Sequence, residues 1–170
     1  MRCVPFEQRK HIASLQRQLL FRGELSVTED RRVHWRLHSP VRVEYQFLRD
    51  GAWRRGATEN PRGEIEPWSR LAVPDAASRA IHDMLAALLD LDAIALTRQF
   101  DLRVTAAAPL VFEATPRSAR LRRVIAKVQV QGDARIERLR VEEAGGNWSE
   151  YLFASPAAGK ACVLPAAPGR

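Results

Sequence analysis

Apolar and polar residues alternate with a period of two through much of this 170-residue chain. The alternation is regular in residues 21–27, 33–37 and 41–47. Because successive side chains of a β-strand point to opposite faces, this pattern predicts strands of a sheet with one apolar face. Trp53 opens a further strand, and similar segments return at 102–106, 110–114, 124–130, 136–142 and 148–153. We therefore expect about nine antiparallel strands.

The middle of the chain changes its period. Pro74-Asp75 is a plausible helix start, and Ile81, Leu85, Leu88 and Leu89 follow at the i, i+4, i+7, i+8 spacing of an amphipathic helix. Asp92 can cap a short second helix that runs through Gln99. The helical segment is therefore expected at about residues 75–99.

One domain is expected over residues 1–155. Residues 156–170 are small, proline-rich and alanine-rich, and we expect them to form a loose C-terminal tail. The order of strands, one helical insertion and strands predicts an α+β fold that is mainly antiparallel β. Such strands can curl into an unclosed half-barrel whose open mouth the helix covers as a lid, and this shape can hold a ligand cavity.

The apolar stripe is the feature that bears most on function. Phe21, Trp35, Phe47 and Trp53 come from four successive strands. They are either an ordinary core packed by the helix or, in part, the lining of a pocket for an apolar ligand. In the second case the binding residues are expected to be Phe21, Leu25, Trp35, Leu37, Tyr45, Phe47 and Trp53, with Ile81, Leu85, Leu88 and Leu89 from the helix.

Motifs for catalysis or for phosphate and dinucleotide binding do not occur in the sequence. His34 and His38 lie four residues apart on the polar face of one strand. They could form a zinc pair, but no third ligand is near in sequence, so we expect two solvated histidines and no metal or cofactor. Cys3 and Cys162 are either plain thiols or one disulfide between the two ends of the chain.

Basic residues outnumber acidic residues by 27 to 20, which favours an anionic partner or surface. Several arginines between residues 31 and 55 fall on the polar face of the predicted sheet. A nucleic-acid interface would also need stacking aromatics, and those lie on the opposite face. We therefore expect a solvated face and no nucleic-acid partner, with contact to anionic lipid or an acidic partner as the alternative.

Several segments resemble the periplasmic lipoprotein-carrier family of LolA-like proteins, in the family's order along residues 6–153. Phe6-Glu7-Gln8-Arg9-Lys10 is similar to its F-x-Q-x-K opening strand, and Phe21 to Leu25 is similar to its x-x-G-x-L strand. The remaining similarities are Val33-His34-Trp35 with Ser39-Pro40, the helical segment from Asp75 to Phe100, Phe112 to Pro116, and Ile136 to Phe153.

The resemblance implies a non-enzymatic, monomeric carrier that holds acyl chains in an apolar cavity. Its cargo would be a lipid, a lipoprotein or another acylated or hydrophobic molecule bound for the outer membrane, with inner- and outer-membrane delivery proteins as partners. It also implies a periplasmic location, although the chain shows no signal peptide and would then be a processed form. Two alternatives stay open: a pocket enzyme or biosynthesis helper using Tyr45 or Tyr151, and a basic module that docks on an acidic partner or membrane.

Overall fold

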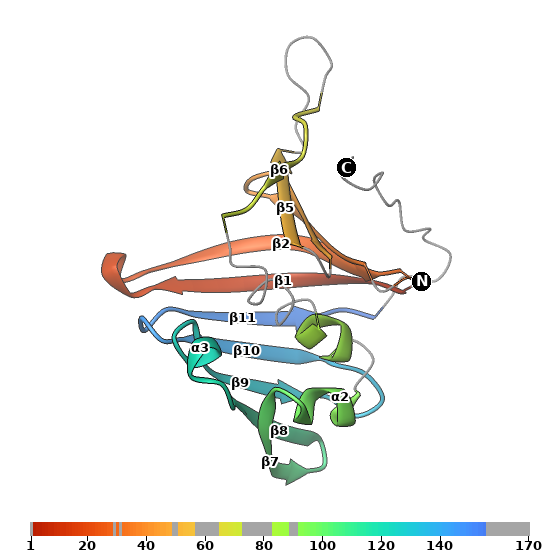
Figure 1. The fold of residues 1–170 in the computed structure, drawn as a ribbon, viewed down its shortest axis with the longest axis vertical. Helices are drawn as coiled ribbons and strands as arrows, with labels where there is room; N and C mark the ends of the chain where they lie inside the picture. Colours follow the sequence, from red (N-terminus) through yellow and green to blue (C-terminus); the bar gives the residue numbers. More distant parts are fainter. Residues whose placement is uncertain are drawn as a thin grey trace.

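Eleven strands form a single antiparallel sheet in the computed structural model of the chain (Figure 1). The structure describes residues 2–28, 30, 32–48, 51–56, 65–72, 83–88 and 92–155. The strands are β1 (Arg2–Ile12), β2 (Arg17–Val27), β3 (Val33–Ser39), β4 (Val43–Leu48), β5 (Gly51–Gly56), β6 (Ser69–Arg70), β7 (Phe100–Ala107), β8 (Leu110–Pro116), β9 (Ile125–Gln131), β10 (Arg138–Glu143) and β11 (Trp148–Phe153).

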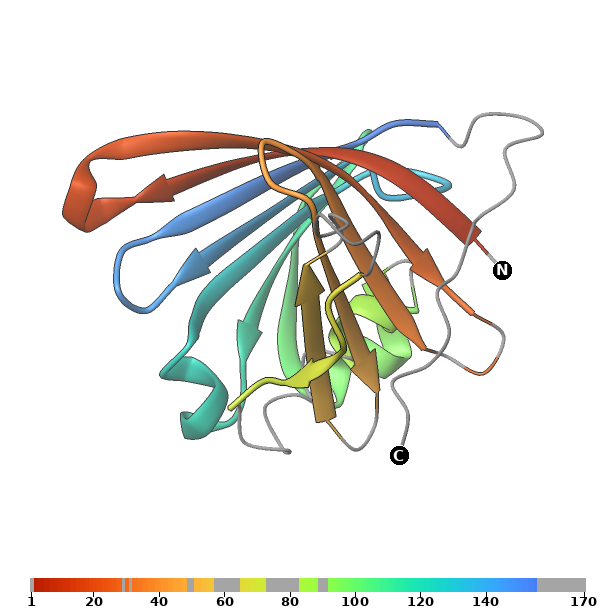
Figure 2. The same ribbon diagram turned by 90° about the horizontal axis from the view of Figure 1, so that it is seen from above.

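The strand order is β6-β5-β4-β3-β2-β1-β11-β10-β9-β8-β7, so β6 and β7 are the two edges and the sheet is unclosed. It is strongly curved, and helical turns lie inside the curve (Figure 2). The mainly antiparallel β class is thus confirmed. To the nine strands expected from alternation the structure adds β6 and β1, of which β1 contains the opening strand that the family resemblance implies. Alternation did not reveal β1 because its inward side chains include Gln8 and Lys10, which are polar.

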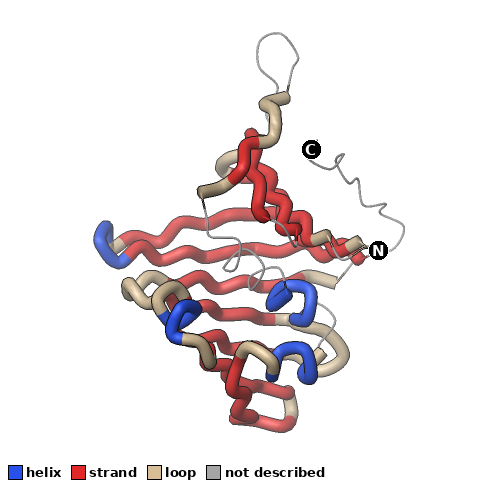
Figure 3. Tube along the Cα trace, in the orientation of Figure 1, coloured by secondary structure: helices blue, strands red, loops and turns tan. Residues whose placement is uncertain are grey.

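The helices of the described residues are short (Figure 3). They are the 3₁₀ turn η1 (Ala13–Leu15), a helical segment at residues 83–88, α2 (Ala93–Thr97) and α3 (Ala119–Arg122). The Asp92 carboxylate accepts a hydrogen bond from the Ala95 amide at 2.9 Å, which confirms the predicted cap. Residues 75–82 and 89–91 of the predicted helical segment, and the predicted tail, lie outside the described residues. None of the described helices has the length and hydropathy needed to span a bilayer.

The hydrophobic core lies between the concave face of the sheet and the helical segments. Leu25 and Leu37 of the sheet, Leu85 and Leu88 of segment 83–88, and Leu96 of α2 are buried in one cluster. Aromatic rings join the two halves of the sheet within this core. The Phe6 ring centre of β1 lies 4.8 Å from that of Trp35 and 6.2 Å from that of Phe153.

A β-bulge changes the expected inward residues of β9. The register between β9 and β10 shifts between Glu142 and Glu143, so that Ile125 pairs with Glu143 while Lys127 pairs with Glu142. Ile125 is therefore buried, whereas Val124 and Ala126 are exposed. The alternation had placed Val124 and Ala126 inward, and that prediction is wrong because sequence spacing alone does not reveal the inserted residue.

Gly23 sits where β2 and β3 approach most closely. The register of this pair shifts between Arg22 and Gly23, and the Phe6 ring lies over the glycine. A β-carbon on Gly23 would lie 2.1 Å from the Arg36 carbonyl oxygen and 2.8 Å from Phe6 Cζ. Because the nearer atom belongs to the backbone, the contact cannot be relieved by rotating a side chain. The fold therefore requires glycine at this position.

The substitution Gly23→Ala is expected to lower the free energy of unfolding by about 3 kcal/mol or more, because it overpacks the β2–β3 contact. Urea unfolding followed by circular dichroism measures the change. Gly145→Ala is the matched control, since a β-carbon there meets no atom within 4 Å and should change stability by no more than about 0.5 kcal/mol. Equal stabilities of the two variants would contradict this account of β2.

Candidate functional site

Three neighbouring strands place aromatic side chains on the concave face. Leu25 of β2 pairs with Trp35 of β3, and Trp35 pairs with Tyr45 of β4, so the three side chains form one row across the sheet. In the adjacent row Val33 pairs with Phe47. The register therefore confirms that these predicted residues share one apolar face.

Burial divides the predicted lining residues into two groups. Leu25 and Leu37 are buried, and so are Leu85 and Leu88 of the helical segment. The aromatic residues are only partly buried against this core, and they are Phe21, Trp35, Tyr45 and Phe47. Ile81 and Leu89 lie outside the described residues. Part of the aromatic surface thus stays accessible on the concave side of the sheet.

Trp53 lies on the opposite face, contrary to the predicted stripe. Leu48 pairs with Gly51, so Phe47 pairs with Ala52 and Gln46 pairs with Trp53. In this register the inward residues of β4, which are odd-numbered, pair with even-numbered residues of β5. The odd-numbered Trp53 therefore points to the opposite face. The Trp53 ring lies under the Arg70 guanidinium, with 5.8 Å between the guanidinium carbon and the ring centre.

The even-numbered register of β5 also brings a charged group to the apolar face. Arg54 pairs with Tyr45 and with Ser69 of the edge strand β6, and it is exposed. It therefore lies at the border of the aromatic row. Sequence alternation did not select Arg54, because that analysis had placed its neighbour Trp53 inward.

Polar side chains occupy the concave face where β1 meets β11. The Gln8 side-chain amide donates to Ser149 Oγ at 3.2 Å and to Tyr151 Oη at 3.1 Å. Further along β1, Lys10 Nζ lies 3.5 Å from a carboxylate oxygen of Glu143. Phe6, Gln8 and Lys10 thus share the inward face, and each contacts the partner half of the sheet. This gives the F-x-Q-x-K pattern a structural role that alternation of apolar residues had missed.

Tyr151 is partly buried beside Gln8 and Ser149, which are buried. Burial raises the pKa of its phenol above the ordinary value of 10. The hydrogen bond with Ser149 lowers this pKa, and the nearby charge of Glu143 raises it, so the net shift is upward. The hydroxyl therefore stays protonated at neutral pH and serves as a hydrogen-bonding group. The Tyr151 ring also packs edge-on against Trp35, with ring centres 5.0 Å apart, and this contact helps to fix the position of the Trp35 ring.

The opposite, polar face carries a ladder of alternating charges rather than the solvated residues that the sequence predicts. Glu24, Arg36, Glu44 and Arg55 are aligned across β2 to β5. Arg36 lies 3.2 Å from Glu24 and 2.8 Å from Glu44, and Arg55 lies 2.7 Å from Glu44. Trp68 covers Arg55, whose guanidinium carbon is 4.5 Å from the ring centre.

His34 is 4% exposed, so the prediction that it is a solvated histidine is wrong. It is aligned with Ser26 and Gln46, which are also buried, and its Nε2 lies 3.9 Å from a Glu44 oxygen. His38 is half-exposed, and its Nε2 lies 3.5 Å from a Glu24 oxygen. Across the described residues no three His, Cys, Asp or Glu side chains are grouped as metal ligands would be.

Ion pairing controls the ionisation of Glu44. Burial alone would raise the pKa of its carboxyl, but the neighbouring His34 and Arg55 and the charge of Arg36 lower the pKa from 4.5 to about 2. Glu44 is therefore ionised at every physiological pH, and its two oxygens are each held by a different arginine. This face is suited to fixing strand register, whereas the concave face offers the apolar surface.

The sequence was compared with protein-family models and with curated proteins, and neither comparison finds a match. The account of the site accordingly depends on its own geometry.

Glu44→Gln is expected to destabilise the fold by about 1 to 3 kcal/mol at pH 7, because it leaves two arginines without their shared carboxylate. Since the folded pKa of about 2 lies below the ordinary 4.5, the stabilisation is complete above pH 4.5 and is lost as the pH falls toward 2. The difference in unfolding free energy between parent and variant should therefore shrink over that range.

Urea unfolding at several pH values measures this difference. Glu7→Gln is the control, because the Glu7 ion pairs with Arg9 and Arg22 are solvent-exposed and should contribute less than about 1 kcal/mol. A Glu44→Gln effect that stays constant from pH 7 to pH 2 would show that ionisation of Glu44 does not stabilise the fold.

Proposed function

We propose that the protein is a non-enzymatic carrier that binds acylated or other hydrophobic cargo on the concave face of its sheet. The observation that carries this proposal is a group of partly exposed aromatic residues on the inner side of an unclosed sheet. Trp35 and Tyr45 lie in one row and Phe47 lies in the next, and the three together are called the aromatic row. Exposed aromatic surface on a concave face is the usual setting for an apolar ligand. The half-barrel of LolA-like proteins, which several segments of the sequence resemble, is an architecture of this kind.

Hydrophobic burial accounts for the binding. Transfer of each methylene group out of water contributes about 0.8 kcal/mol. One acyl chain of ordinary length would contribute roughly 8 to 12 kcal/mol before the costs of ordering are subtracted. Hydrophobic burial has no preferred direction, so the face would accept related chains with little discrimination. Such weak selectivity suits a protein that must also release its cargo.

The helical cover would act as a lid over this face. Leu85 and Leu88 of segment 83–88 and Leu96 of α2 are buried in the same cluster as the sheet residues. Displacement of these short helices would separate their leucines from the sheet residues of that cluster. Release of cargo to an outer-membrane partner in the periplasm would then follow opening of the lid.

The proposal predicts that the aromatic row, and not the outer face, retains lipid. Native mass spectrometry of the protein purified from cells, followed by organic extraction, should reveal bound fatty acid, phospholipid or another apolar molecule. Phe47→Gln should weaken uptake of a fluorescent acyl probe by about tenfold, since it places an amide where the chain would pack. Trp53→Gln is the matched control, because Trp53 belongs to the neighbouring strand but faces the other way.

Circular dichroism should show the same strand signal in both variants. A difference in probe uptake between them then reflects binding and not loss of the fold. A clean apo mass together with no probe uptake by the parent protein would overturn the carrier proposal. Equal loss of uptake in Phe47→Gln and Trp53→Gln would likewise overturn the concave face as the binding site.

A further inference from the structure

The hairpin between β1 and β2 ends in exposed leucines. Leu15 of η1 is 62% exposed, and Leu19 and Leu20 of β2 are 40% and 47% exposed. Every residue from 14 to 20 is exposed. The hairpin projects beyond the other strands of the sheet (Figure 2). An apolar group of this kind on a projecting tip has to be explained by something that covers it.

The leucines occupy both faces of the two-stranded ribbon. Leu19 pairs with Lys10 and therefore lies on the concave side, whereas Leu20 pairs with Arg9 and lies on the convex side. Leu15 is at the tip between them. A protein partner docked on one face of the ribbon would leave the other face in water. A bilayer surface that surrounds the tip would cover both faces at once.

The tip is held in a fixed conformation. The Ala13 amide donates to Asn147 Oδ1 of the β10–β11 turn at 3.0 Å, and the Gln16 amide donates to the Ala13 carbonyl at 3.2 Å. Gln16 adopts a left-handed conformation with φ of 48°, which closes the turn and directs the chain into β2. The leucines are therefore presented by a structured support.

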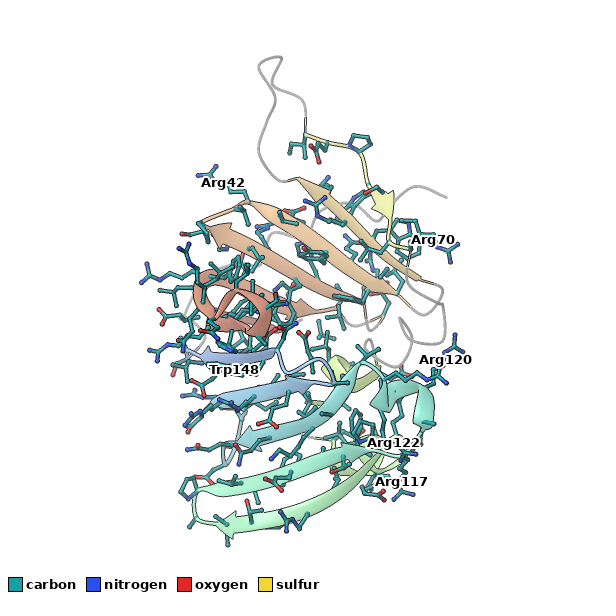
Figure 4. The ribbon with its side chains drawn as sticks, turned by 90° about the vertical axis from the view of Figure 1, so that its left-hand side faces the viewer. Arg42, Arg70, Arg117, Arg120, Arg122 and Trp148 are labelled. Carbon is teal, nitrogen blue, oxygen red and sulfur yellow. The ribbon has the colours of Figure 1, made fainter. Side chains whose placement is uncertain are left out.

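An indole and a guanidinium lie beside the stem of the hairpin, next to His11. Trp148 stacks on His11 with ring centres 5.4 Å apart, and the Arg140 guanidinium carbon lies 4.3 Å above the Trp148 ring. Trp148 lies beside the hairpin when the molecule is viewed from this end (Figure 4). Tryptophan is favoured at the interface between water and lipid, where its ring is apolar and its N–H is polar.

The outer part of the hairpin carries basic residues, of which Arg9 and Arg22 pair with Glu7 nearer the base and Lys10 pairs with Glu143. Residues 9–22 contain Arg9, Lys10, Arg17 and Arg22 and no acidic residue. Arg17 is the cation nearest the tip, and it is exposed on β2 between Leu15 and Leu19. A cation beside exposed leucines complements an anionic lipid headgroup above an acyl layer.

We propose that the β1–β2 hairpin is a membrane-docking element that inserts Leu15, Leu19 and Leu20 into the surface of an anionic bilayer, with Arg17 at the phosphates. Arg17 lies between Leu15 and Leu19, and its long side chain can extend back to the phosphate level while its methylene groups stay against the acyl chains. The inference goes beyond the carrier proposal and does not depend on what the concave face holds. It applies equally to the empty and the loaded protein.

Flotation with lipid vesicles tests the proposal. The parent protein should bind vesicles of phosphatidylglycerol and phosphatidylcholine and should bind pure phosphatidylcholine vesicles much less. The double variant Leu15→Gln, Leu20→Gln should bind the anionic vesicles at least about tenfold more weakly. Ile94→Gln is the matched control, because Ile94 of α2 is 77% exposed but lies away from the hairpin, and its binding should equal that of the parent.

Arg17→Gln should weaken binding to the anionic vesicles while leaving the weak binding to neutral vesicles unchanged. Brominated lipids should quench the Trp148 fluorescence of a variant whose other tryptophans are replaced by Phe. Binding of the double leucine variant at parent strength, or an equal loss in Ile94→Gln, would overturn the proposal. A leucine-dependent change in oligomeric state without vesicle binding would overturn it in favour of contact between two copies of the chain.

Uptake of the acyl probe in solution separates this inference from the carrier proposal. The double leucine variant should take up the probe as the parent protein does, because its substitutions lie outside the aromatic row. Loss of vesicle binding with retained probe uptake supports the docking element alone. Loss of both together would contradict the separation of the two sites.

Discussion

Pairing of β1 with β11 is the interaction on which the rest of the structure depends. Every other pair of neighbouring strands among the described residues is adjacent in sequence, so this ladder alone joins the meander β1–β6 to the meander β7–β11. Inward residues of β1 reinforce the junction at three levels: Phe6 packs on Phe153, Gln8 bonds to Tyr151, and Lys10 approaches Glu143. The junction turns two meanders into one curved sheet, whose concave face carries the core.

The two faces of the sheet have separate physical roles. On the convex face the aligned charges of Glu24, Arg36 and Glu44 fit only one register, because a shift by one residue would direct them into the apolar core. The concave face supplies the hydrophobic packing, in which Trp35 contacts both Phe6 and Tyr151 and so helps to join the two halves of the sheet. The projecting hairpin is independent of both faces and presents a third surface.

Much of the fold could be predicted from sequence, because period-two alternation reports local strand geometry. It placed Leu25, Trp35, Tyr45 and Phe47 on one face correctly. It could not place Trp53, whose orientation depends on the register between β4 and β5, nor Val124, whose orientation depends on the bulge between β9 and β10. Burial of His34 was equally invisible, since its neighbours Ser26 and Gln46 come from other strands. The exposed leucines of the hairpin resemble core residues in sequence, and only their position at a projecting tip distinguishes them.

Photo-crosslinking with a fatty acid that carries a diazirine near its methyl end tests the central claim most directly. After irradiation and digestion, mass spectrometry locates the labelled residues. The account predicts label on the concave side of β3 and β4, around Trp35, Tyr45 and Phe47, and on helical segment 83–88, with competition by unlabelled fatty acid. Label confined to the convex face, or label that excess unlabelled fatty acid does not reduce, would contradict the concave face as a carrier site.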